Sequence, residues 1–282
     1  MSTFAIAGLQ LELKATNNID TIIREIRAAK TRFPFVKMIT TGELSLFGPN
    51  PEFAVELPGP EEARFCDAAK ELGVWILPGS LFERCGDKIY NTTPVINPEG
   101  EVIKRYRKMF PFYPYEVGVT PGTEFVTFDV PEVGRFGVSI CYDMWFPETI
   151  RALACQGVEV VLHSTMTNTV DRNIELSIAR TNAAVNQCYM VDINVAGDIG
   201  WGESIVAGPG GEVIHQASST REIIVVELDL DYVRRVRKNG WQGLTQPLKS
   251  FRDSTVHFPQ YEKDAVLDAS LDYLGELKKP SA

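Results

Sequence analysis

Short apolar runs alternate with amphipathic stretches along most of the chain. Residues 4–11 have the pattern of a strand, and apolar side chains recur at helical spacing in residues 19–32. Similar patterns, bounded by turn residues, predict strands at residues 36–41, 74–82, 125–130, 136–140, 158–163, 188–194 and 223–229. They also predict helices at 61–72, 147–155 and 171–187, and hairpins at 90–106 and 204–215. This alternation favours an α/β layered fold over separate all-α and all-β parts.

The 282 residues could form one large layered domain or two small domains. No shift in composition marks a linker, so we expect a single domain over residues 1–282 with its core at about residues 4–230. Residues 107–122 are rich in Pro, Tyr and Phe and lack a clear period, which predicts a long surface or active-site loop. Residues 231–282 are polar and interrupted by prolines, which predicts a tail that packs on another surface.

Composition and charge exclude several classes of protein. Apolar residues make up 44% of the chain, enough for a buried core, and the net charge of −9 without long basic runs argues against a nucleic-acid or anionic-membrane surface. No apolar run is long enough to span a bilayer. Five cysteines cannot all pair and no signal peptide is visible, so we expect reduced thiols and a cytoplasmic location. The three histidines are far apart, so we expect no metal, and no cofactor is expected either.

Cys141 lies where a predicted strand meets a predicted helix, since Pro147 suits a first helical turn. A bend of this kind lifts a side chain out of the sheet and directs free backbone N–H groups to the same point. Cys141 is therefore a candidate nucleophile, although most free cysteines are small buried hydrophobes.

Two further segments carry groups that could activate a thiol. Glu43 ends a predicted strand between apolar neighbours, and Lys108 follows the hairpin at residues 90–106. A thiol at its reference pKa of about 8.5 is mostly protonated at neutral pH, so a reactive cysteine needs a base or a nearby cation. Taken singly, Glu43 could be a solvated loop acid and Lys108 a surface cation.

Together, these segments resemble the nitrilase superfamily of carbon-nitrogen hydrolases. The resemblance is carried by TTGELSLFG around Glu43, YRKMFP around Lys108 and CYDMWFPE from Cys141 onward, in that order. It extends over about residues 4–229 and includes PG at 121–122, ARTNAAVN at 179–186, GESIV at 202–206 and PGG at 209–211.

The resemblance implies an α-β-β-α sandwich of four layers with two central mixed sheets. It also implies a small-molecule amide or nitrile as the substrate, cleaved through a covalent intermediate on Cys141. Glu43 would be the general base, Lys108 and the backbone N–H of Tyr142 would hold the oxyanion, and Glu116 would help to position Lys108. Amide hydrolysis is the commoner activity of the family, and the same groups would also serve a nitrilase. A homodimer or higher homo-oligomer is implied, with the tail crossing the partner.

The sequence says less about the substrate pocket than about the reacting groups. Family members that act on N-carbamoyl amino acids place basic residues soon after the cysteine, whereas Met144 and Trp145 stand there in this chain, which favours an apolar or uncharged substrate. The segment HSTMTN from residue 163 departs from the family pattern, and we expect His163 and Thr165 to shape the pocket together with Trp145.

Two other interpretations stay open at this point. His163 ends a predicted strand and could be the base of a Cys-His dyad, which would leave Glu43 and Lys108 without a role. A catalytically silent small-molecule-binding scaffold is also conceivable, although such a protein would be expected to lack a member of the triad.

Overall fold

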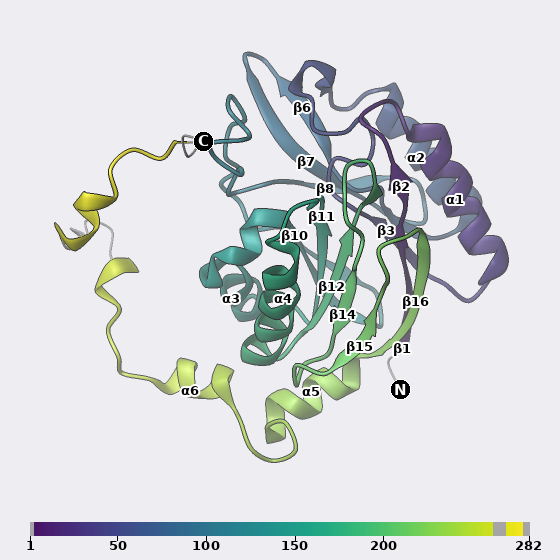
Figure 1. Ribbon diagram of the computed structural model, residues 1–282. Coiled ribbons are helices and arrows are strands. Elements are labelled where there is room, and N and C mark those ends of the chain that lie inside the picture. Colours follow the sequence, from purple (N-terminus) through teal and green to yellow (C-terminus); the bar gives the residue numbers. More distant parts are fainter. Residues whose placement is uncertain (1–2, 262–268, 279–282) are drawn as a thin grey trace.

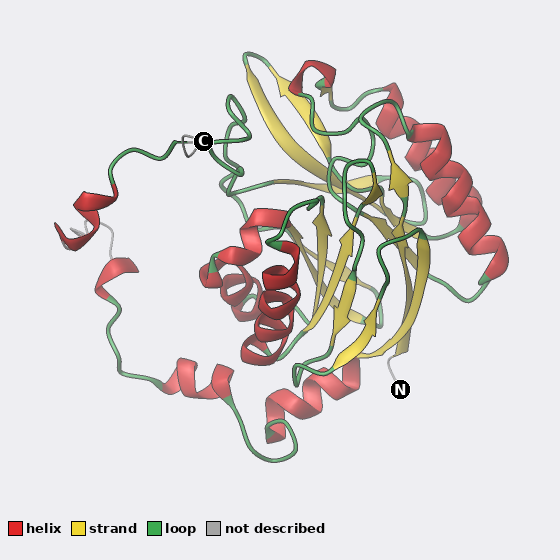
Figure 2. Ribbon diagram, viewed as in Figure 1, coloured by secondary structure: helices red, strands yellow, loops and turns green. Residues whose placement is uncertain are grey.

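Two β-sheets packed face to face form the centre of the protein, and helices cover both outer faces (Figures 1 and 2). The computed structural model describes residues 3–261 and 269–278. The first sheet has eight strands, in the order β16 (Glu222–Asp229), β1 (Thr3–Gln10), β3 (Met38–Thr41), β5 (Trp75–Leu77), β7 (Lys88–Ile96), β6 (Leu81–Cys85) and β4 (Val55–Glu56), with β8 (Val102–Arg107) paired to β7. The second has six, in the order β15 (Val213–Gln216), β14 (Ile205–Ala207), β12 (Tyr189–Asn194), β11 (Val160–Thr165), β10 (Gly134–Ile140) and β9 (Thr127–Val130).

Both sheets mix parallel and antiparallel pairs, as expected for this class of sandwich. In the first sheet β1 runs parallel to β3 and antiparallel to β16, and in the second β10 runs parallel to β11 and antiparallel to β9. A short third pairing joins β2 (Glu12–Leu13) to β13 (Ala196–Gly197).

The outer layers are pairs of helices. The first sheet is covered by α1 (Ile19–Arg32) and α2 (Pro60–Leu72), and the second by α3 (Pro147–Cys155) and α4 (Arg172–Asn186) (Figure 1). The prediction of an α-β-β-α sandwich is confirmed.

Side-chain alternation in the strands builds two separate cores. In β1, Phe4 and Ile6 face the core between the sheets, whereas Ala7 and Leu9 face the core beneath α1 and α2. The Phe4 ring meets the ring of Phe136 in β10 edge to face, with centroids 5.5 Å apart, so the two sheets are in direct aromatic contact.

The predicted strand at residues 74–82 is wrong in one respect, because it breaks into β5 and β6 at Pro78, Gly79 and Ser80. Gly79 has φ +84°, and a Cβ there would lie 2.0 Å from the carbonyl oxygen of Gly42. The break lets Ser80 Oγ accept a hydrogen bond of 2.9 Å from the backbone N–H of Leu44. Gly79 therefore permits the close approach that fixes the segment after β3.

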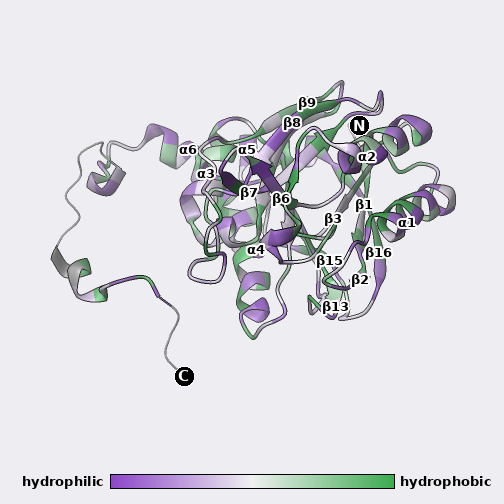
Figure 3. Cartoon of the chain, turned by 90° about the horizontal axis from the view of Figure 1, so that it is seen from above, coloured by the Kyte–Doolittle hydropathy of each residue, from purple (hydrophilic) through white to green (hydrophobic). Residues whose placement is uncertain are grey.

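The polar segment expected to begin the tail instead starts with helix α5 (Leu230–Asn239). Val233 and Val236 are buried on one face of this helix, and Arg237 donates hydrogen bonds to the carbonyl oxygens of Val158 and Gln187. The core thus continues to about residue 239, because one narrow apolar face suffices to dock a mostly charged helix. After α5, residues 240–261, including α6 (Pro247–Asp253), run along the outside of the molecule and away from it (Figures 1 and 3).

Among the residues that the structure describes, no helix is both long and apolar enough to cross a membrane.

We predict that Gly79→Ala lowers the free energy of unfolding by roughly 3 kcal/mol, because left-handed backbone and a steric clash each cost about 1 to 2 kcal/mol. Gly73→Ala is the matched control, since Gly73 has φ +59° but a Cβ at this position would meet no other atom within 4 Å. It should cost about 1 kcal/mol. Urea unfolding measures both variants, and equal losses would contradict the role of the close approach at Gly79.

Candidate active site

Three strand ends bring Glu43, Lys108 and Cys141 to one place. Glu43 follows β3 and Lys108 follows β8 in the first sheet, whereas Cys141 follows β10 in the second. The Lys108 ammonium lies 2.7 Å from Glu43 Oε1, and the Cys141 thiol is within hydrogen-bonding reach of the Glu43 carboxylate. All three residues are buried. The structure therefore brings together the sulfur, the acid and the amine that the sequence singled out.

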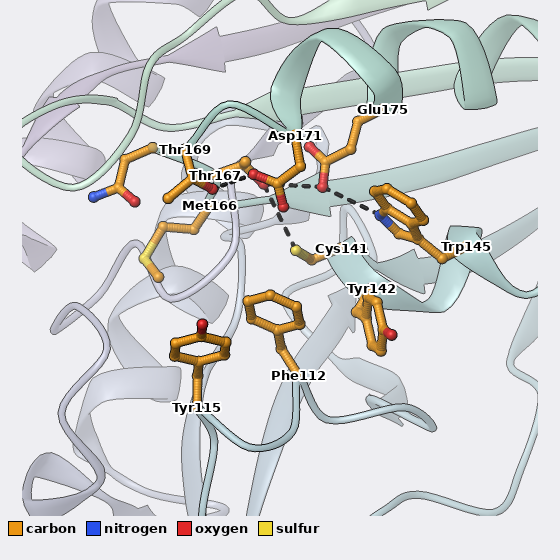
Figure 4. A pocket seen from close by; sticks show the side chains of 11 residues that line it. Phe112, Tyr115, Cys141, Tyr142, Trp145, Met166, Thr167, Thr169, Asp171 and Glu175 are labelled. Carbon is orange, nitrogen blue, oxygen red and sulfur yellow. Dashed lines mark hydrogen bonds between the residues drawn. The ribbon is translucent and has the colours of Figure 1, made fainter. Parts of the chain in front are cut away.

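Cys141 sits on a sharp bend. Strand β10 ends at Ile140, Cys141 itself has φ +45°, and a short 3₁₀ helix runs from Cys141 to Trp145. A positive φ is costly for a residue with a Cβ, and such strain clusters at functional sites. In Figure 4 the sulfur points from this bend into a pocket. The N–H of Tyr142 lies in the first turn of the short helix, where N–H groups lack an intrahelical acceptor.

Burial and the charges of neighbouring groups determine the ionisation of Glu43, Lys108 and Cys141. Burial alone would lower the pKa of Lys108, but the carboxylates of Glu43 and Glu116 outweigh it and hold that pKa well above its ordinary value. Burial raises the pKa of Glu43 against the opposing effect of Lys108. Burial and the nearby Glu43 carboxylate raise the pKa of the Cys141 thiol well above its usual range. At neutral pH the resting sulfur is thus a thiol, with a charged lysine beside it.

Glu116 and Asn91 complete the contacts of Lys108 and Glu43. Glu116 belongs to the loop after β8, and its Oε2 lies 2.7 Å from Lys108 Nζ. The Asn91 amide donates to Glu43 Oε1 at 2.8 Å and to Glu116 Oε1 at 3.1 Å. Sequence reasoning missed Asn91, and its signal was a run of polar residues, Asn91, Thr92 and Thr93, inside a strand that is buried there.

Asp143, two residues after the cysteine, turns away from the thiol. Its carboxylate accepts hydrogen bonds from Tyr106 Oη at 2.6 Å and from the backbone N–H groups of Phe110 and Ile140 at 2.9 Å each. Burial raises the pKa of Asp143 to about 6 despite these donors. Asp143 therefore ties the end of β10 to the loop after Lys108.

The pocket above Cys141 has a volume of about 400 Å³. Its walls come from the loop after β8, the bend at Cys141, the segment after β11 and the start of α4 (Figure 4). Besides Cys141, the lining residues are Phe112, Tyr115, Tyr142, Trp145, Met166, Thr167, Asn168, Thr169, Asp171 and Glu175. Tyr142 and Trp145, two predicted site residues, are among them.

The expectation that His163 and Thr165 line the pocket is wrong. Strand β11 extends to Thr165, so both residues lie within the strand and are at most 1% exposed. His163 Nδ1 is 3.1 Å from Ser139 Oγ, and Thr165 Oγ1 donates to Asp192 Oδ1 at 2.8 Å. Burial lowers the pKa of His163 to about 4, so its ring is neutral at pH 7. The pocket wall begins one residue later, at Met166.

A buried polar chain leads away from the thiol on the pocket side. Thr167 Oγ1 lies 3.9 Å from Cys141 Sγ and donates to Glu175 Oε1 at 3.1 Å. Glu175 Oε2 is 3.2 Å from Arg172, which also pairs with Asp192 at 2.9 Å. Burial raises the pKa of the Glu175 carboxyl to about 7. The sequence offered no clear sign of these roles, because charged residues in a first helical turn are usually solvated.

In residues 3–261 and 269–278, no group of three or more His, Cys, Asp or Glu residues is arranged to hold a metal ion.

Comparison with characterised proteins gives omega-amidases among the relatives of this chain. The chain is 30% identical over 258 residues to the omega-amidase NIT2 of Homo sapiens, covering 84% of this chain and 93% of that protein. It is 32% identical over 204 residues to omega-amidase NIT2-B of Xenopus laevis, covering 67% and 73% respectively.

Solved structures and a family model agree with this similarity. Nit3 of Saccharomyces cerevisiae, described as a member of the nitrilase superfamily, superposes with a TM-score of 0.77 at 27% identity, covering 84% of this chain and 93% of Nit3. An amidase from Nesterenkonia sp. shares the fold, with a TM-score of 0.74 at 23% identity over 83% of this chain and 94% of its own. The carbon-nitrogen hydrolase model matches residues 3–238. The chain therefore belongs to the carbon-nitrogen hydrolase family of the nitrilase superfamily.

Proposed function

We propose that the protein hydrolyses the C–N bond of small amides through a thioester on Cys141. The observation that carries the proposal is the contact of Glu43 with both Lys108 and Cys141, the member of the trio that lines the pocket. A buried thiol with a raised pKa needs a base within reach, and Glu43 is that base. An amide is favoured over a nitrile because the relatives named above are omega-amidases.

In the first half-reaction, Glu43 takes the thiol proton as Cys141 attacks the amide carbon. Negative charge then develops on the amide oxygen, where the Lys108 ammonium and the Tyr142 N–H stabilise it, a role worth on the order of 3 kcal/mol per donor. The protonated Glu43 passes its proton to the amide nitrogen as the C–N bond breaks. Ammonia or an amine leaves, and the acyl group stays on the sulfur as a thioester.

In the second half-reaction, Glu43 takes a proton from water while the water oxygen attacks the thioester carbon. The same two donors hold the oxyanion, the C–S bond breaks, and Glu43 returns the proton to the sulfur. A carboxylic acid leaves. Glu116 serves as a positioning residue, since its carboxylate and that of Glu43 together hold the Lys108 ammonium from two directions.

We also propose a reducing, cytoplasmic setting. The five cysteines all lie in described parts of the chain and all are free, including two exposed ones, Cys85 and Cys155. An enzyme that depends on one thiol is best kept where thiols stay reduced.

We further propose that the protein forms a homodimer in which the segment after Gly240 lies on the partner. This segment exposes large apolar side chains, among them Val256 at 63% and Tyr261 at 59%. Part of it contacts its own chain, since the Arg151 guanidinium lies 5.3 Å from the centroid of the Phe251 ring. Exposed apolar side chains in a row are typical of surfaces that are covered in an assembly.

Cys141→Ala should lower ammonia release by at least about 10⁴-fold, because no other group can form the thioester. A screen of small aliphatic, aromatic and carbamoyl amides and of nitriles, with ammonia as the readout, measures this. Cys155→Ala is the matched control, since Cys155 is exposed on α3, and it should retain wild-type rates. Equal turnover by Cys141→Ala and wild type would refute the proposed chemistry.

Glu43→Gln should lower kcat by roughly 10²–10⁴-fold, because a neutral amide of the same shape cannot take the thiol proton. His163→Asn tests the competing Cys-His dyad and should keep kcat within about tenfold of wild type, since His163 contacts Ser139 and lies outside the pocket lining. Steady-state kinetics on the best amide from the screen separates the two. The opposite pattern, with kcat lost in His163→Asn and kept in Glu43→Gln, would favour the dyad.

A chain ending at Gly240 should lose the dimer, because α5 and the core remain but the exposed apolar segment is gone. Light scattering of the full chain and of the shortened chain gives both masses. Urea unfolding of the shortened chain serves as the control that its core is intact. An unchanged dimer would remove the proposed role of the segment, and a monomeric full chain would refute the homodimer.

A further inference from the structure

The pocket above Cys141 carries negative charge on its wall. Asp171 and Glu175 lie one turn apart at the start of α4, so both side chains face the same side of the helix. Figure 4 shows both carboxylates on the pocket side opposite Phe112 and Tyr142. Among the described residues that line the pocket, none is Lys, Arg or His.

Two buried cations near this wall, Arg172 and Lys108, are already matched by acids. Arg172 has no exposed surface, and its guanidinium pairs with Glu175 and Asp192 and donates to the carbonyl oxygen of Glu203 at 2.9 Å. Lys108 is likewise held by two carboxylates beneath the pocket floor. Neither cation is left with an unmatched charge that could receive a carboxylate of a substrate, so the pocket favours positive charge.

The wall facing α4 is aromatic, which is the second and independent indication. Phe112 and Tyr115 stack with ring centroids 4.9 Å apart, and Tyr142 meets Phe112 edge to face at 5.0 Å. Aromatic ring faces attract cations through their quadrupole, and aromatic side chains are used in this way to recognise alkylammonium ligands. The two walls thus favour the same kind of ligand group.

The distance between the reacting thiol and the acidic wall is short. Thr167 Oγ1 lies between them, 3.9 Å from Cys141 Sγ and 3.1 Å from Glu175 Oε1. A short aliphatic chain spans such a gap. A bound cation would also favour the ionised form of Glu175, whose pKa burial raises to about 7.

We propose that the substrates are small amides whose far end carries an ammonium group, with Asp171 and Glu175 as specificity-determining residues. This inference rests on the proposed amide hydrolysis, concerns the charge of the substrate, and replaces the uncharged substrate expected from Met144 and Trp145, because the carboxylates of Asp171 and Glu175 line the pocket. An amide with a carboxylate at its far end is disfavoured, because that group would lose water beside two carboxylates without gaining a cation.

Three amides of matched size test the inference: 4-aminobutanamide carries a cation, pentanamide is neutral, and succinamate carries an anion. We expect kcat/KM to be at least about tenfold higher for 4-aminobutanamide than for pentanamide, and lowest for succinamate.

Substitutions of the two carboxylates test whether they cause the preference for the cationic amide. Asp171→Asn and Glu175→Gln should each lower the ratio of kcat/KM for the cationic amide to kcat/KM for the neutral amide by about tenfold. This ratio cancels any loss of correctly folded enzyme, which matters because Glu175 pairs with Arg172. Asp87→Asn makes the same change in net charge at an exposed turn between β6 and β7, and it should leave the ratio as in wild type.

The outcomes separate the two proposals. If no amide in the wider screen releases ammonia, both the proposed function and this inference fall. If amides are hydrolysed but the cationic one shows no preference, this inference alone is overturned. The same holds if the preference exists but neither Asp171→Asn nor Glu175→Gln reduces it.

Discussion

The buried ammonium of Lys108 is the group on which the rest of the site depends. A lysine that is 1% exposed is stable as a cation only where acids surround it, because taking its charge out of water costs several kcal/mol. Glu43 and Glu116 supply those acids from two different parts of the chain, and Asn91 holds the two carboxylates in place. The lysine in turn keeps Glu43 close to the sulfur. The charged groups of Lys108, Glu43 and Glu116 are thus stabilised by their mutual attraction and positioned by the strands and the loop that carry them.

The two-sheet architecture makes this arrangement possible. The first sheet supplies Glu43 and Lys108, and the second supplies Cys141, so packing the sheets together also assembles the site. The close approach at Gly79 and the ties of Asp143 to Tyr106 and to the loop backbone fix the two sides locally. Rigid strands hold the reacting groups, and loops and a helix start supply the pocket, which is a common division in enzymes.

The parts of the structure that depend on the local sequence pattern could be predicted from the sequence. The helices at residues 19–32 and 147–155 have the predicted bounds, since spacing and Pro147 mark them clearly. The trio was found because each member stands in a motif that resembles a family. By contrast, residues 74–82 have a continuous apolar pattern, and the break at Gly79 depends on a contact with Gly42 that is distant in sequence.

The pocket was harder to predict for the same reason. The residue at which strand β11 ends determines which side chains face the cavity, either His163 and Thr165 or the residues after them. The sequence marks strand ends poorly within an apolar run. Arg172, Glu175 and Asp192 look like ordinary polar residues until tertiary packing buries them as a group. The docking of α5 depends on three buried apolar residues in a charged segment, Leu230, Val233 and Val236, a face too narrow to stand out in composition.

The loop after β8 contributes both to the contacts of Lys108 and to the pocket wall, so a change that affects one role also affects the other. The same short stretch supplies Glu116 to the lysine and the rings of Phe112 and Tyr115 to the pocket, and the N–H of Phe112 donates to the Glu116 carboxylate. Reshaping this aromatic wall would therefore disturb the charge balance beneath it. The opposite wall, at the start of α4, has no direct contact of this kind with Lys108 among the interactions described. Divergence in ligand preference is accordingly expected to accumulate on α4, while the aromatic loop is held back by the chemistry it supports.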